Sequence, residues 1–119
     1  MQLKGRLPNW ANEGIAIYCQ PDKGAKRVQE ARRYHLKKQL QPTQEFMQFM
    51  LYPSGSEAVA RFYSQAGLTF GVLARRLGPL KALRLTLKIN REGPVKALES
   101  ARLSLPAFES LLKQELLRR

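Results

Sequence analysis

The sequence predicts an all-α protein, a compact bundle of about six short-to-medium helices. Apolar residues recur every three to four positions, as at Phe62, Ala66 and Phe70, which is the period of a buried helix face. No segment alternates apolar and polar residues in the way that a half-buried strand does. Gly and Pro residues break the chain often, but no linker is long enough to divide it, so residues 1–119 are predicted to form one helical domain.

Three helices are predicted in the first half of the chain, over 10–18 or 10–19, 25–40 and 44–51. Asn9 has a suitable side chain to cap the first helix, and Thr43 has one for the third. The breaker residues of segment 21–24, Pro-Asp-Lys-Gly, separate the first helix from the second. Pro42 ends the second helix, because proline does not continue a helix.

The second half of the chain is predicted to be helical up to about residue 77, over 80–89, over 94–101 and from 105 to the C-terminus. Ser54 and Glu57 have the spacing of a capping box at the start of the long helix. Gly78-Pro79 stops that helix, and Ser104 is placed to cap the last one. Leucines at 80, 83 and 87 suggest the apolar face of helix 80–89, and residues 90–93 are expected to form a loop.

Composition limits the class of protein. The 119 residues suffice for one modest core, and 44% of them are hydrophobic, as in ordinary globular proteins. No apolar run approaches the roughly 18 residues of a membrane-spanning helix, so no membrane span is expected. The N-terminus lacks the apolar stretch of a signal peptide, which leaves the compartment open. Cys19 is the single cysteine, which excludes an internal disulfide and favours a small buried side chain.

The net charge of +12 favours contact with a polyanion, such as nucleic acid, an acidic lipid surface or an acidic partner domain. The basic residues concentrate in the predicted helix 25–40, at Lys26, Arg27, Arg32, Arg33, Lys37 and Lys38. These six cations are either a solvated face or a face that binds a polyanion. The sequence contains no helix-turn-helix, zinc-finger or aromatic RNA-binding signature.

The segment Pro8-Asn9-Trp10-Ala11-Asn12-Glu13-Gly14-Ile15-Ala16-Ile17-Tyr18 resembles the Pro-x-Trp-x-Asn-Glu-Gly-x-Ala-x-Tyr motif of gluzincin zinc metallopeptidases. These include the aminopeptidase N type and the related peptidase MA group. Later segments follow the family's order of helices, at 63–78, 80–87, 97–101 and 104–109, with a glycine-containing loop at 92–93. The chain departs from the family at Arg102, where a glycine is frequent. The resemblance implies the helical C-terminal subdomain of a gluzincin.

The same resemblance implies roles for two residues. Glu13 corresponds to the third zinc ligand, and Gly14 beside it permits close packing of its helix. Tyr63 corresponds to the tyrosine that donates a hydrogen bond to the tetrahedral oxyanion, with a half-buried packing tyrosine as the alternative. Zinc is the implied cofactor.

The first half of such a zinc site has no counterpart in this sequence. The first two ligands come from a His-Glu-x-x-His helix whose second histidine stands about 19 positions before the glutamate, whereas twelve residues precede Glu13. His35 is the single histidine, lies downstream among cations, and is expected to be a solvated or packing side chain. We therefore expect no bound zinc and no peptidase activity from this chain alone, unless the missing helix is supplied.

Three functions follow as alternatives. The chain is the second half of a peptidase domain whose partner is the missing N-terminal half, or a small basic helical protein that binds nucleic acid, or a non-catalytic interaction protein that self-associates through an exposed apolar face. Trp10 is expected to anchor the core rather than to contact a substrate. Phe46, Met47, Phe49 and Met50 are expected to fill the core or an interface.

Overall fold

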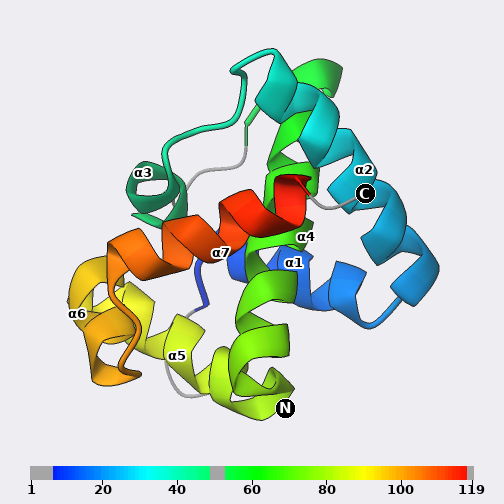
Figure 1. Cartoon of the computed structure of the whole chain (residues 1–119). Coiled ribbons are helices and arrows are strands. Elements are labelled where there is room, and N and C mark those ends of the chain that lie inside the picture. Colours follow the sequence, from blue (N-terminus) through cyan, green and yellow to red (C-terminus); the bar gives the residue numbers. More distant parts are fainter. Residues whose placement is uncertain (1–6, 49–52, 118–119) are drawn as a thin grey trace.

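Seven α-helices make up the computed structural model, which describes residues 7–48 and 53–117 (Figure 1). Their bounds are α1 Asn9–Tyr18, α2 Pro21–Leu36, α3 Thr43–Gln48, α4 Ser56–Leu77, α5 Pro79–Glu92, α6 Pro94–Ser100 and α7 Leu105–Leu117. The all-α prediction is confirmed, and the described residues contain no strand. Figure 1 shows α4 running through the middle of the molecule, with α2 along one side, α5 and α6 towards the other, and α7 crossing α4.

The start of α1 differs by one residue from the prediction. Asn9 is the first helical residue rather than the cap, because Pro8 occupies the cap position in an extended conformation. The carbonyl oxygen of Pro8 accepts hydrogen bonds from the backbone N–H groups of Ala11 and Asn12, at 3.0 and 3.2 Å. Proline can do this because a cap residue needs its carbonyl and not its N–H.

The expected break at residues 21–24 is wrong, since this segment forms the first turn of α2. Pro21 is the first helical residue, a position where its missing N–H leaves no helical bond unmade. The N–H of Gly24 donates to the carbonyl of Gln20 at 2.9 Å and continues the helix. Cys19 lies in the short junction between α1 and α2 and is exposed, which corrects the expectation of a buried thiol.

The α2 helix ends at Leu36 and not at Leu40, because its end is a Schellman motif. The N–H of Lys38 donates to the carbonyl of His35 and that of Gln39 to the carbonyl of Tyr34, both at 2.9 Å. This pattern requires a left-handed residue after the helix, and Lys38 has a φ of 56°. The sequence has a lysine at this position, whereas a glycine would have indicated the end of the helix.

Two further boundaries in the middle of the chain depart from the prediction. Thr43 is the first residue of α3 rather than its cap, and the predicted extension to residue 51 lies partly outside the described residues, as do Phe49 and Met50. The capping box at Ser54 is wrong, because Gly55 is the residue before α4 and no side chain caps that end.

The α4–α5 junction is as predicted, but α5 is longer and turned differently. Gly78, with a φ of 88°, ends α4, and Pro79 begins α5. The expected loop at 90–93 is wrong, since α5 continues to Glu92. Leu80 is 59% exposed, so the predicted leucine face is wrong; the buried face carries Ala82, Leu85, Thr86 and Ile89. The smaller Ala82 and Thr86 suit a close helix contact.

The two C-terminal helices follow the prediction. Pro94 begins α6, which ends at Ser100, one residue before the predicted Ala101. The hydroxyl oxygen of Ser104 accepts a hydrogen bond from the N–H of Ala107 at 3.2 Å, so the predicted cap of α7 is confirmed.

The core gathers on both sides of α4. Its largest fully buried side chains are aromatic, namely Trp10, Phe46, Phe70 and Phe108. The Cα radius of gyration is 13.1 Å, close to the roughly 13.5 Å expected of a compact chain of this length. The predictions that Trp10 anchors the core and that Phe46 and Met47 fill it are confirmed.

Candidate functional site

The helix that carries Glu13 packs closely on α4. Gly14 is the point of nearest approach, since a Cβ atom there would lie 2.6 Å from the Cβ of Phe70 and 2.7 Å from the carbonyl oxygen of Ala66. Real side chains essentially never approach so closely, so this contact requires glycine. The ring of Tyr18 adds an edge-on contact with Phe70, at 5.6 Å between ring centres. The position of Glu13 is therefore fixed by the backbone contact of the next residue.

A second close contact joins the same helices on the flank that bears Glu13. A Cβ atom on Gly67 would lie 3.2 Å from Cγ2 of Ile17. Residues four apart stand above one another on a helix. One turn back from Ile17 on α1 is Glu13, and one turn back from Gly67 on α4 is Tyr63. Both side chains are half-buried.

Tyr63 is a packing residue on one side and open on the other. Its ring lies 6.0 Å from that of Phe62, and the guanidinium carbon of Arg27 stands 5.4 Å from its centre. No buried side-chain oxygen or nitrogen of the described residues lacks a hydrogen-bond partner, and the Tyr63 hydroxyl makes no hydrogen bond with these residues, so it reaches solvent. The hydroxyl thus remains available as a donor, while the ring is held by its neighbours.

Arg27 above Tyr63 is itself fixed by an acidic partner. Its Nη1 lies 2.9 Å from Oε2 of Glu30, and the Ser64 hydroxyl lies 3.0 Å from the same oxygen. This small network ties α2 to α4 beside Tyr63.

The start of α1 is anchored by Trp10. Its side chain is fully buried, its indole Nε1 donates to the carbonyl oxygen of Met47 at 3.0 Å, and its ring lies 6.1 Å from that of Phe46. A buried indole N–H needs such a partner. Trp10 and Gly14 together hold the two ends of the turn that includes Glu13.

These residues do not by themselves make a zinc site. A catalytic zinc takes three protein ligands and an open position, and Glu13 supplies one carboxylate. Among residues 7–48 and 53–117, no three His, Cys, Asp or Glu side chains converge as a ligand set. His35 lines a different hollow, formed with Thr69 and Leu112 between α2, α4 and α7.

The six cations predicted on helix 25–40 have two different environments. Arg27 pairs with Glu30, and Arg32 donates through Nη2 to the carbonyl oxygen of Glu115 at 3.1 Å. The other four, Lys26, Arg33, Lys37 and Lys38, are exposed. The structure therefore leaves four of these six cations exposed, fewer than the sequence indicates.

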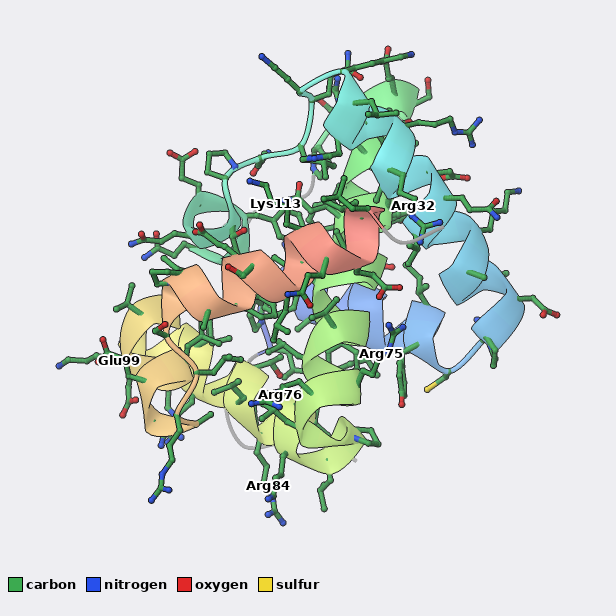
Figure 2. The ribbon with its side chains drawn as sticks, in the orientation of Figure 1. Arg32, Arg75, Arg76, Arg84, Glu99 and Lys113 are labelled. Carbon is green, nitrogen blue, oxygen red and sulfur yellow. The ribbon has the colours of Figure 1, made fainter. Side chains whose placement is uncertain are left out.

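A hollow of about 690 Å³ lies between α1, α2, α4 and α7, with Gly67 and Gly71 among its lining residues. Figure 2 labels Arg32 on α2 and Arg75 on α4, which both reach the C-terminal part of α7. There Nη1 of Arg75 lies 2.5 Å from Oε2 of Glu115. Glu115 therefore holds both arginines, Arg32 by its backbone oxygen and Arg75 by its carboxylate, which neutralises one of the two positive charges at this hollow.

Sequence reasoning missed a second group of basic residues. Residues 58–91 contain seven Lys and Arg and no Asp or Glu, a signal that was present in the sequence. Four cations line a hollow of about 370 Å³ beside α5, namely Lys81, Arg84, Lys88 and Arg102. Figure 2 shows the side chain of Arg84 extending away from α5 at the edge of the molecule.

Comparisons of the chain with protein-family models, with curated proteins and with solved structures found no match. Within the described residues, no helix is both long and apolar enough to cross a membrane.

Proposed function

We propose that this chain is the second half of a gluzincin-type zinc peptidase domain, in which Glu13 is the third zinc ligand. The observation that carries the proposal is the packing of the Asn-Glu-Gly motif. Gly14 is demanded by the contact with Ala66 and Phe70, and this contact fixes the backbone next to Glu13, whose side chain is half-buried. A ligand must be held in this way before the metal arrives, because loose ligands lose affinity.

In this proposal Tyr63 donates a hydrogen bond to the oxyanion of the substrate. Such a donor is effective when its geometry is fixed beforehand. Arg27 and Phe62 hold the ring, while the hydroxyl remains free of partners among the described residues. Because one carboxylate does not hold catalytic zinc, we derive no hydrolytic step for this chain alone.

The first test is zinc binding by this chain. After incubation with zinc and dialysis, we expect far less than one zinc per chain by elemental analysis, and no release of a fluorescent group from aminopeptidase or endopeptidase substrates. Near-stoichiometric zinc would contradict the proposal, because it would require a ligand set that does not include the missing histidines.

The second test begins with the DNA upstream of the Met1 codon. If an open frame encodes His-Glu-x-x-His at the family's distance, the longer protein should bind one zinc, and Glu13→Gln should lower zinc affinity by at least tenfold. Glu57→Gln is the matched control, because Glu57 is an exposed glutamate in the first turn of α4. Tyr63→Phe should lower kcat by about 10²-fold with little change in KM. Equal zinc binding by the Glu13→Gln and Glu57→Gln proteins would refute the assignment.

Nucleic-acid binding is the second candidate, favoured by the exposed cations of α2 and of the residues directly after it. Lys26, Arg33, Lys37 and Lys38 are exposed, whereas Arg27 and Arg32 have protein partners. Binding through phosphates would weaken steeply with salt, with a slope of about −0.7 per contact for a single strand. Fluorescence anisotropy with a labelled oligonucleotide tests this, and no change at low salt would end this candidate.

Self-association is the third alternative. In the part of the chain that the structure describes, the exposed large apolar side chains lie on five different helices, at Tyr18, Leu36, Leu80, Val95 and Leu117. Sedimentation at several concentrations tests whether any of them forms an interface, and a strictly monomeric protein would exclude it.

A further inference from the structure

We propose that the hollow beside α5 is a binding site for a diphosphate group. Its cations come from two separate parts of the chain. Lys81, Arg84 and Lys88 belong to α5, and Arg102 belongs to the connection between α6 and α7. All four residues line one hollow of about 370 Å³, so four positively charged side chains surround the same part of the surface.

The three α5 cations share one side of their helix. Positions 81, 84 and 88 are separated by three and four residues, which places them on one face of the helix. Like charges at these spacings repel each other and destabilise a helix slightly. A multivalent anion between them would remove this repulsion.

No acidic side chain neutralises the hollow. Its lining contains no Asp or Glu, and among the described residues none of the four cations forms an ion pair within 4.0 Å. Glu92 and Glu99 are near in sequence, and neither pairs with Lys88 or Arg102. The hollow differs in this respect from the one at Arg32 and Arg75, where Glu115 accepts from both arginines.

Arg102 is present at a backbone position that disfavours it. The end of α6 is a Schellman motif, in which Arg102 N–H donates to the Glu99 carbonyl at 2.9 Å and Leu103 N–H donates to the Leu98 carbonyl at 3.0 Å. Arg102 is the left-handed residue of this motif, with a φ of 58°. Glycine would adopt this conformation without strain, so an arginine here has a cost that a role for its side chain would explain.

The charge of the site indicates the kind of ligand. A phosphate monoester carries about −1.5 to −2 charges at neutral pH, so two linked phosphates match four cations better than one does. Four cations around one hollow of about 370 Å³ suit a compact anion rather than an extended strand. The diphosphate could be free or part of a nucleotide, and the two are separated by experiment.

The test uses the whole chain and inorganic pyrophosphate, titrated by calorimetry at constant low ionic strength. We expect measurable binding, and perturbed amide NMR signals at residues 81–88 and 100–102. Arg102→Gly should weaken binding by tenfold or more, which is the loss of one charge-assisted hydrogen bond, while leaving Tm unchanged or raised. Adenosine diphosphate is the second probe. Tighter binding than pyrophosphate would indicate a nucleotide, and equal or weaker binding a free diphosphate.

Lys38→Gly is the matched control. Lys38 is also the left-handed residue of a Schellman motif and also carries one positive charge, but it follows α2 and does not line the hollow. It should change pyrophosphate affinity by less than twofold. Equal weakening by Arg102→Gly and Lys38→Gly would reduce the effect to net charge and overturn the proposal. Absence of pyrophosphate binding by the unaltered chain would overturn it as well.

Discussion

The contact between Gly14 and α4 predicts that Gly14→Ala destabilises the protein, although helix propensity alone predicts the opposite. In a helix interior, replacing Gly by Ala stabilises a protein by about 1 kcal/mol. At Gly14, however, the new methyl group would lie 2.6 Å from the Cβ of Phe70 and 2.7 Å from the Ala66 carbonyl oxygen. Neither atom is the end of a flexible side chain, so α1 must move away from α4.

The magnitude follows from two opposing terms. Overpacking of a core costs about 1–3 kcal/mol, and rigid neighbours favour the upper value, about 3 kcal/mol. Subtracting the propensity gain of about 1 kcal/mol leaves a net loss of about 2 kcal/mol for Gly14→Ala. For a chain of this size, 1 kcal/mol corresponds to about 4 °C in Tm, so we expect Tm to fall by about 8 °C.

Gly71→Ala is the control, because Gly71 lies in the interior of α4 and a Cβ atom there has no neighbour within 4 Å. It should raise Tm by about 4 °C. Thermal unfolding followed by circular dichroism, together with urea titration at 25 °C, measures both. If Gly14→Ala were as stable as the unaltered protein, the close packing of α1 on α4 would be refuted, and with it the argument that this contact fixes Glu13.

Three other changes have defined outcomes. Trp10→Phe removes the donor to the Met47 carbonyl and should cost about 1–3 kcal/mol in a urea titration; a loss below this range would mean that the bond is not formed. Lys38→Gly relieves left-handed strain of about 1–2 kcal/mol against an unfolded-state entropy cost of about 0.4–1 kcal/mol, so Tm should rise by a few degrees, and a fall would contradict the Schellman assignment. Ser104→Ala removes the cap on the Ala107 N–H and should cost about 1 kcal/mol, with Ser104→Asp as the variant expected to restore it.

Much of the fold could be predicted because helical periodicity and Gly-Pro pairs are local signals. The stop at Gly78-Pro79 and the cap at Ser104 depend on neighbouring residues alone, and both are confirmed. The errors arose where one residue type serves two purposes. Pro21 was expected to break a helix and instead begins one, since the first turn does not use its N–H.

The orientation of α5 could not be predicted for a different reason. The choice between its leucine face and the face of Ala82 and Thr86 is made by the helices that pack on it, and periodicity contains no information about them. The left-handed ends at Lys38 and Arg102 were also hidden, because neither is glycine.

For the candidate site, the sequence indicated which residues to inspect but not their surroundings. The close approach at Gly14 was expected from the motif, whereas the Arg27 guanidinium above Tyr63 depends on the placement of α2. The hollow at Lys81 and Arg102 joins residues about twenty positions apart. The sequence indicated it by the absence of Asp and Glu from residues 58–91, which a search for motifs does not detect.

The dependence of α1 on α4 also bears on the order in which the chain folds. Ten residues are too few for a stable isolated helix in water, and the partner that holds Gly14 lies some fifty positions further along the chain. Closing such a loop costs roughly 3.5 kcal/mol in chain entropy from its logarithmic length dependence. Helices α4, α5 and α6, which follow one another directly, have no such delay. We therefore expect α1 to be the last helix to order during refolding and the first to detach on unfolding, so that its carboxylate acquires a fixed direction only in the fully assembled molecule.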